Sequence, residues 1–285
     1  MGEVLLSEVV SHAVQKFAAA EIETPQVDAE LIAAHILNFS RGEVQAALLT
    51  GFILTEEQTK LFAEYSARRF TREPLQHITG FAYFRQLQLS VGRGVFVPRP
   101  ETEVVVQIAI DELRASELEA PIAVDLGTGS GAIAIAVNHE RPDVTVTAVD
   151  RSTAALSLAR ENADRIGVAI ELLESDLAAA VTGRTFDVVA ANLPYIPDGD
   201  PRTEAGVVRH EPHLALYAGP DGLDLIRRLV ADAPALLNPG GMIVLENSDE
   251  QAAAVRGLLE AAGFVDVACH RDLAGVDRVV AGRLG

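Results

Sequence analysis

The feature that most constrains the fold is a regular alternation of strand-like and helix-like segments that begins at Pro121. This alternation is typical of a parallel, doubly wound α/β sheet. The expected strands are Ile122–Asp125, Thr145–Asp150, Ile170–Leu173, Phe186–Ala191, Met242–Glu246, Val265–His270 and Asp277–Ala281. The expected helices begin near Gly129, Ser152, Gly222 and Asp249. Since the loop around Ala274-Gly275 is too short for a crossover helix, we predict a seven-stranded sheet whose last strand is antiparallel.

The residues before this region predict a small helical domain, at 1–74, followed by a hairpin or linker at 75–100. Apolar residues recur at helical spacing over Val4–Phe17, after Thr24-Pro25, over Gly42–Leu49 and over Thr55–Arg72. Thr55 and Gln58 have the spacing of a capping box. In the linker, Leu75–Phe81 and Phe84–Val91 are expected to form two short strands. The remainder, 101–285, is expected to form the α/β domain that contains the sheet.

Composition and charge limit the classes of molecule that the chain is expected to bind. The chain has 285 residues, a hydrophobic fraction of 49% and a formal charge of -18. A surface this acidic repels phosphate backbones, so no direct nucleic-acid binding is expected. There is no membrane-spanning apolar run and no basic signal-peptide start, so we expect a cytoplasmic protein without a membrane partner. The single cysteine, Cys269, and the isolated pair His210 and His213 predict no metal site.

A glycine-rich turn follows the first strand of the sheet. Its residues are Asp125-Leu-Gly127-Thr128-Gly129-Ser130-Gly131, with the third glycine one residue too early for a dinucleotide fingerprint. Such a turn brings backbone amides close to a ligand at a helix N-terminus and suits the methionine and ribose parts of S-adenosylmethionine. Asp150 ends the next strand, where a carboxylate can accept both ribose hydroxyl hydrogens. Asp176 follows the third strand and is expected to reach the adenine through its side chain or adjacent backbone.

A polar corner, Asn192-Leu193-Pro194-Tyr195, follows the fourth strand. The lone pair of an amide or aniline-like nitrogen is delocalised, and accepting hydrogen bonds from both N–H groups would expose it. Asn192 offers a side-chain carbonyl, the Leu193 carbonyl is held by rigid Pro194, and Tyr195 offers a flat face for stacking. Together with the glycine turn, this corner predicts methyl transfer from S-adenosylmethionine to a planar nitrogen, without a general base.

The chain closely resembles the release-factor glutamine methyltransferases (the PrmC/HemK type) over nearly its whole length. The matching segments are Pro74–Gly80, Pro98–Glu103, Asp125–Gly131, Asn192–Tyr195, Glu211-Pro212 with Ala215-Leu216, Asp221–Leu223 and Arg271–Arg278. The resemblance implies a class I S-adenosylmethionine-dependent methyltransferase domain and an N-terminal domain that helps hold the substrate. It implies methylation of N5 of the glutamine in the Gly-Gly-Gln tripeptide of bacterial class I release factors, with S-adenosylhomocysteine as the second product. The release factor is therefore the expected partner of a monomeric enzyme.

Site residues carried over by resemblance extend both halves of the site. Gly127–Gly131, Asp150 and the neighbourhood of Leu177 would hold the cofactor, and Asn192–Tyr195 would grip the glutamine amide. Arg99 and Glu101, in the Pro-Arg-Pro-Glu-Thr-Glu segment, become candidates for substrate binding. On physical grounds alone, an acidic pair at a helix start is explained by the helix dipole.

Two departures from the family pattern keep alternatives open. Leu193 stands where the family usually has a first proline, although its backbone carbonyl is retained, and Ser248 stands where glycine is usual. Asn-Leu-Pro-Tyr is also typical of ribosomal-RNA adenine dimethyltransferases, against which the acidic charge and the helical domain argue. A ribosomal-protein glutamine methyltransferase shares the same chemistry. A cofactor-binding protein without catalytic activity is the alternative of a different class.

Overall fold

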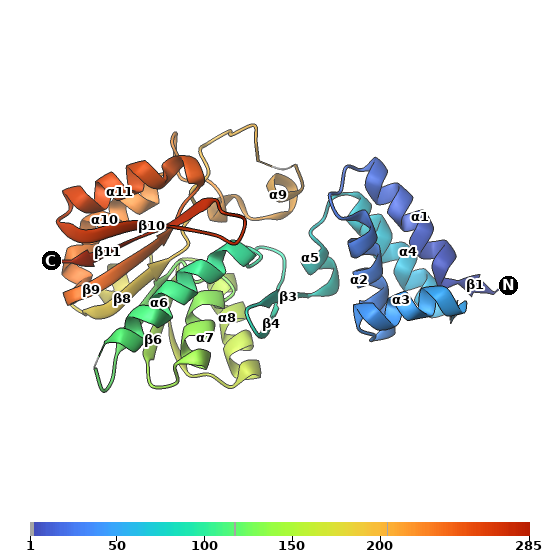
Figure 1. Cartoon of the computed structure of the whole chain (residues 1–285), viewed down its shortest axis with the longest axis horizontal. Coiled ribbons are helices and arrows are strands. Elements are labelled where there is room, and N and C mark those ends of the chain that lie inside the picture. Colours follow the sequence, from blue (N-terminus) through green and yellow to red (C-terminus); the bar gives the residue numbers. More distant parts are fainter. Residues whose placement is uncertain (1–2, 117, 204) are drawn as a thin grey trace. The chain divides into compact units, whose positions relative to one another are not determined.

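The computed structural model describes residues 3–116, 118–203 and 205–285, which fall into two compact units. The first unit runs to Gly80 and also includes helix α9 (Ala205–His210). The second unit contains Phe81–Thr203 and Glu211–Gly285. The division after Gly80 lies beyond residue 74, where the sequence predicted the helical domain to end. Figure 1 draws the elements of both units along the chain.

Helices make up most of the first unit. They are α1 (Leu6–Ala19), α2 (Pro25–Leu37), α3 (Arg41–Thr50), α4 (Glu56–Phe70) and α5 (Leu75–Thr79), with short antiparallel strands β1 (Val4–Leu5) and β2 (Ile53–Leu54). The predicted capping box is present at α4: the Thr55 N–H donates to Gln58 Oε1 at 2.9 Å, and the Gln58 N–H donates to Thr55 Oγ1 at 3.2 Å. Fully buried Leu6, Phe17 and Ile32 lie in the core of these helices.

The segment Leu75–Thr79 corrects one prediction from the sequence. It was expected to be a strand of a hairpin, but it forms helix α5. Pro74 precedes the helix with non-helical backbone angles (φ -52°, ψ 135°), and Gly80 ends it with a φ of 81°, a left-handed conformation that suits glycine. The hairpin lies later, as β3 (Phe81–Phe84) paired with β4 (Leu87–Ser90). The signals that start and end a helix, Pro74 and Gly80, therefore outweighed the apolar residues that indicated a strand.

The second unit is built on a seven-stranded sheet. Its strands are β5 (Ile122–Leu126), β6 (Thr145–Asp150), β7 (Ile170–Glu174), β8 (Phe186–Ala191), β9 (Leu237–Glu246), β10 (Phe264–Arg271) and β11 (Asp277–Leu284). Their order across the sheet is β10-β11-β9-β8-β5-β6-β7. Strands β5 to β9 pair in parallel, whereas β11 is antiparallel to both of its neighbours. The predicted class I methyltransferase fold is thus confirmed.

Helices cover both faces of this sheet (Figure 1). One face packs against α6 (Glu103–Ala115), α7 (Ala132–Glu140) and α8 (Thr153–Ile166). The other packs against α10 (Asp224–Leu236) and α11 (Ala252–Ala261). Burial of each large aliphatic side chain in such a layer contributes roughly 1.5–3 kcal/mol. The short helices η1 (Pro100–Thr102), η2 (Ala179–Val181), η3 (His213–Ala215) and η4 (Asp249–Gln251) lie in the connections.

The order of the strands determines where a ligand can bind. From β5 the chain runs outward to β6 and β7, and it then crosses back to β8 on the other side of β5. The loops at the carboxyl ends of β5 and β8 therefore lead to opposite sides, which opens a crevice at this switch point. Within the described part of the chain, no helix is long and apolar enough to cross a membrane.

Candidate active site

The glycine turn joins β5 to α7 at the switch point of the sheet. Gly127, Gly129 and Gly131 have φ values of 83°, 57° and 85°, which lie in the left-handed region where a Cβ is disfavoured. A Cβ on Gly127 would lie 2.9 Å from Leu193 Cδ2, and a Cβ on Gly131 would lie 2.7 Å from Ile135 Cδ1. At Gly127 and Gly131 the backbone conformation favours glycine, and a Cβ would also force the ends of the Leu193 and Ile135 side chains to shift.

Asp125 supports this turn from inside the protein. Its Oδ2 accepts a hydrogen bond from Thr128 Oγ1 at 2.6 Å and one from the Ala134 N–H at 3.2 Å. Burial raises the pKa of this carboxyl to about 7, against the two hydrogen bonds, which lower it. The nearby Asp150 carboxylate raises it further. Asp125 thus links the middle of the turn to the first turn of α7, and its carboxyl stays protonated across the acidic range.

The free energy of unfolding should fall as the pH rises from 3.8 to about 7, because the folded chain then keeps a proton on Asp125 that the unfolded chain has lost. Asp125→Asn keeps an oxygen that can accept the same hydrogen bonds but cannot ionise. We expect it to flatten part of this fall. Urea unfolding at a series of pH values measures the slope, and equal slopes for wild type and variant would contradict the expectation.

Asp150 ends β6 with both carboxylate oxygens facing backbone amides. Oδ2 accepts from the Gly129 N–H and Oδ1 accepts from the Ser152 N–H, each at 2.8 Å. A carboxylate has about four acceptor positions, so both oxygens can take further donors. Asp176, by contrast, pairs with Arg228 at 2.7 Å, and this hydrogen bond lowers the pKa of the carboxyl.

The corner after β8 is fixed by side chains from distant parts of the same unit. Asn192 Nδ2 donates to Thr102 Oγ1 at 2.9 Å, and the Tyr195 hydroxyl donates to Glu246 Oε1 at 3.3 Å. The Tyr195 carbonyl accepts from Gln251 Nε2 at 2.8 Å. Burial raises the pKa of the Tyr195 phenol, so this ring stays neutral. The Leu193 side chain is buried and packs in the hydrophobic core of this unit.

One cavity, of about 510 Å³, joins the turn and the corner. Its walls include these residues predicted from the sequence: Gly127, Thr128, Gly129, Ser130, Asp150, Asp176, Leu177, Asn192, Leu193, Pro194 and Tyr195. Its size is typical of a site for a small organic ligand. The described residues include no group of three or more His, Cys, Asp or Glu side chains placed to hold a metal ion.

Three other predicted residues do not line this cavity. Gly131 precedes α7 at its N-cap. Arg99 donates to buried Glu211 at 3.3 Å, and its guanidinium carbon lies 5.1 Å from the centre of the Phe96 ring. Glu101 lies in the short helix η1. A substrate contact by Arg99 or Glu101 stays a prediction.

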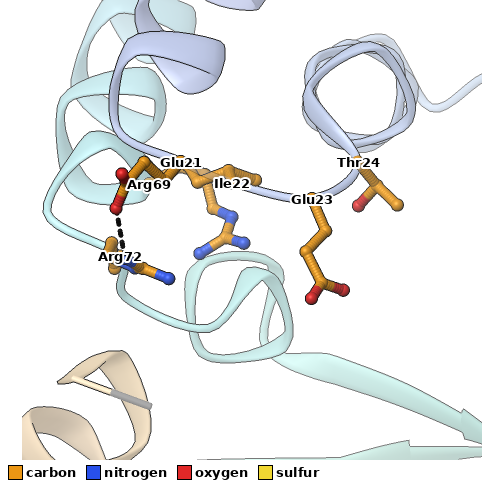
Figure 2. Close-up of a pocket in the computed structure, with 6 residues that line it drawn as sticks. All are labelled: Glu21, Ile22, Glu23, Thr24, Arg69 and Arg72. Carbon is orange, nitrogen blue, oxygen red and sulfur yellow. Dashed lines mark ion pairs between the residues drawn. The ribbon is translucent and has the colours of Figure 1, made fainter.

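A second, smaller hollow lies in the helical unit (Figure 2). It measures about 120 Å³ and is lined by Glu21, Ile22, Glu23, Thr24, Arg69 and Arg72. Both of its arginines face acidic partners: Arg69 Nε pairs with Asp28 at 2.7 Å, and Arg72 with Glu21 at 3.7 Å. Because the charges are matched within the unit, this hollow does not indicate an anion site.

Three relatives are similar to this chain over almost its whole length. A release factor glutamine methyltransferase of Streptomyces coelicolor is 45% identical over 274 residues, covering 94% of each chain. The protein of the same name from Burkholderia pseudomallei is 42% identical and covers 90% of this chain and 92% of its own. That of Deinococcus radiodurans is 39% identical and covers 98% of each. The chain belongs to the release factor glutamine methyltransferases.

Family models agree with this membership. Residues 8–80 match the PrmC N-terminal domain, and residues 94–209 match the Methyltransferase small domain. The predicted resemblance to the release factor glutamine methyltransferases is thus confirmed.

Solved structures show the same fold at lower identity. A methyltransferase from Pyrococcus furiosus has a TM-score of 0.54 at 18% identity, covering 78% of this chain and 99% of its own. A T. thermophilus 16S rRNA N2 G1207 methyltransferase, in complex with AdoMet and guanosine, has a TM-score of 0.54 at 19% identity, covering 72% and 50%. At these identities the likeness shows the fold alone.

Two polar residues of this release factor glutamine methyltransferase were assigned no role from the sequence. The Thr102 hydroxyl accepts a hydrogen bond from the Asn192 amide, and the Glu246 carboxyl accepts one from the Tyr195 hydroxyl. A usable signal was present for Glu246, since it ends a strand at the same edge of the sheet as Asp150. Thr102 gave no such signal, because its contact with Asn192 spans 90 positions of the sequence.

Proposed function

We propose that this chain transfers a methyl group from S-adenosylmethionine to N5 of the glutamine in the Gly-Gly-Gln tripeptide of bacterial class I release factors. The observation that carries the proposal is the Asn192–Tyr195 corner, which shares one cavity with the glycine turn. Leu193 lies directly against Gly127, because a Cβ added to Gly127 would be only 2.9 Å from Leu193 Cδ2. The cofactor end and the amide end of the site are thus adjacent.

The cofactor end offers the polar groups that S-adenosylmethionine needs. Backbone groups of Gly127–Gly131 would face its methionine part, and Asp150 would accept hydrogen bonds from both ribose hydroxyls. Leu177, which is buried with a φ of 49°, and Asp176 would border the adenine. When bound, S-adenosylmethionine supplies an electrophilic methyl group and leaves as S-adenosylhomocysteine. The residues present fit this group.

At the amide end, the bond from Asn192 Nδ2 to Thr102 fixes the orientation of the side-chain amide. Its Oδ1 is then the atom available to accept one N–H of the substrate glutamine. The Leu193 carbonyl would accept the other N–H, and the Tyr195 ring would stack on the amide plane. Two such acceptors favour a pyramidal nitrogen with an exposed lone pair. The nitrogen attacks the methyl carbon as the bond from carbon to sulfur breaks, and the cationic N-methylated amide then loses one acidic N–H proton to solvent. No general base is therefore needed before the attack, and preorganised polar groups account for the rate.

Charge supports a protein partner over a nucleic acid. The net charge of -18 opposes association with phosphate backbones. We propose that the helical unit helps to hold the release factor, and that the chain acts as a monomer in the cytoplasm.

Incubation with S-adenosylmethionine labelled in its methyl group tests the function. The substrates to compare are a release factor, the same factor with the Gly-Gly-Gln glutamine replaced, a ribosomal protein and ribosomal RNA. We expect label in the intact release factor and none in its variant. Label in RNA would refute the proposal, and label in the ribosomal protein alone would move the activity to that substrate.

Replacing Asp150 with alanine should weaken binding of S-adenosylmethionine roughly tenfold to a hundredfold, because a charge-assisted hydrogen bond contributes about 1.5–3 kcal/mol. Titration calorimetry measures the Kd. Asp143→Ala is a matched control, since that exposed aspartate precedes the other end of the same strand and pairs with Arg141. Equal affinities for the two variants would remove Asp150 from the site.

A further inference from the structure

Glu246, the last residue of β9, lies against Tyr195 of the corner and near Thr102, whose hydroxyl holds the Asn192 amide. It is buried, with 2% of its surface exposed. Its Oε1 accepts the Tyr195 hydroxyl at 3.3 Å. The Thr102 hydroxyl, which accepts a hydrogen bond from Asn192 Nδ2 at 2.9 Å, lies near enough to this carboxyl to lower its pKa. A single carboxyl therefore lies behind both the stacking ring and the amide.

The second oxygen of this carboxyl is unusual. Among the described residues, Glu246 Oε2 is buried without a hydrogen-bond partner, an arrangement that disfavours the charged form. Burial raises the pKa of Glu246 to about 7, and Glu101 raises it further. Thr102, Tyr195 and Arg278 lower it, and the charge of Arg278 is shared with Asp272 at 3.3 Å.

A purely structural role does not explain this choice of residue. An apolar side chain would fill the same space without an unpaired buried oxygen. What a carboxyl adds is an acceptor for the Tyr195 hydroxyl and a polar neighbour for Thr102. Both of those residues touch, directly or through Asn192, the place where the substrate amide is proposed to bind.

We propose that Glu246 is a positioning residue that fixes the Tyr195 ring and the Asn192 amide, through the Tyr195 hydroxyl and Thr102. The inference rests on the proposed function, because the groups it positions are those assigned to the glutamine amide. Glu246 itself touches no reacting atom.

Steady-state kinetics with a release factor tests this role. Glu246→Ala should lower kcat on the order of tenfold to a hundredfold, since small misplacements of reacting groups have effects of this size. Glu246→Gln retains an oxygen acceptor and an N–H donor in the same volume, and should restore kcat to within roughly threefold of wild type. The Kd for S-adenosylmethionine should be unchanged in both. Glu260→Ala, at an exposed carboxyl paired with Arg256, is the control for loss of a glutamate.

A double-mutant cycle with Tyr195→Phe tests the proposed route. That change removes the hydroxyl that donates to Glu246 and leaves the ring. If Glu246 acts partly through this hydroxyl, the effects of Glu246→Ala and Tyr195→Phe on kcat should be smaller together than their product. Fully multiplicative effects, or an unchanged kcat in Glu246→Ala, would overturn the positioning role.

A measurement independent of turnover separates this inference from the proposed function. In protein labelled with ¹³C at the tyrosine ring, the Tyr195 signal, identified by its loss in Tyr195→Phe, should titrate with a midpoint at about 7. The titration should be absent in Glu246→Gln. A Tyr195 signal that is flat in wild type overturns the contact with an ionisable Glu246. Failure of the wild-type chain to label any release factor would instead overturn the proposed function, and the titration would still decide the contact.

Discussion

Replacing Asn192 with alanine is expected to remove ~2–4 kcal/mol of transition-state stabilisation, the usual loss when a preorganised polar contact is deleted. The Kd for S-adenosylmethionine should stay close to its wild-type value, because Asp150 and the glycine turn would hold the cofactor without this side chain. Kinetics with the release factor would then show the loss in kcat. Calorimetry on the same samples gives the affinity.

The reason for so large an effect is that Asn192 is already oriented in the free protein. Its Nδ2 is engaged by Thr102 at 2.9 Å, so the position of Oδ1 does not have to be found during the reaction. Alanine removes this acceptor and leaves the Thr102 hydroxyl without its donor. One N–H of the substrate amide would then face no fixed oxygen, and the nitrogen lone pair would stay delocalised.

A matched control exists in the same unit. Asn238 Nδ2 donates to Asp187 Oδ1 at 2.7 Å, near the amino end of β9, whereas the site lies at the carboxyl ends of the strands. Asn238→Ala should reduce stability by about 0.5–1.5 kcal/mol, as expected for one hydrogen bond, and should leave kcat unchanged. An Asn192→Ala variant with the turnover of wild type would refute the role assigned to Asn192.

The centre of the sheet could be predicted from the sequence because strands β5, β6 and β8 are buried on both faces over most of their length. Such strands appear as short continuous apolar runs between turn signals, and the predicted bounds of β6 and β8 agree with the structure. Strand β9 begins earlier than the predicted Met242, at Leu237. Leu237 pairs with Phe186 of β8, which is distant in the sequence, and such tertiary pairing is not contained in local propensity.

The site was predictable only where its residues are contiguous. The glycine turn and the Asn192–Tyr195 corner each follow one strand, so both were visible as motifs. Thr102 and Glu246 lie on separate elements and become part of the corner only when η1, β8 and β9 meet. Arg99 shows the same limit, because its ion pair with Glu211 spans 112 positions. Without the fold, neither the contacts of Thr102 and Glu246 with the corner nor the ion pair of Arg99 with Glu211 could be assigned.

Replacing Gly222 with alanine should be the most damaging single methyl addition near the corner. Gly222 has a φ of 74°, and a Cβ there would lie 2.1 Å from the Tyr195 carbonyl oxygen and 2.7 Å from Gln251 Nε2. Gln251 holds that carbonyl and also donates to the Asp221 carbonyl at 2.9 Å. The methyl group therefore displaces backbone atoms of Tyr195 and breaks the bonds that fix them.

We expect a loss of stability of about 3 kcal/mol or more: ~1–2 kcal/mol for a left-handed alanine and about 1 kcal/mol for each hydrogen bond lost. Turnover should fall as well, because the ring and the Leu193 carbonyl move with the loop. Gly240→Ala separates the two causes, since Gly240 has a φ of 79° and its Cβ would meet nothing within 4 Å. Urea unfolding of both variants gives the difference, which is the contribution of the Tyr195 contact. Equal losses of stability, with kcat retained in Gly222→Ala, would mean that the corner tolerates displacement of Tyr195 and does not depend on this loop.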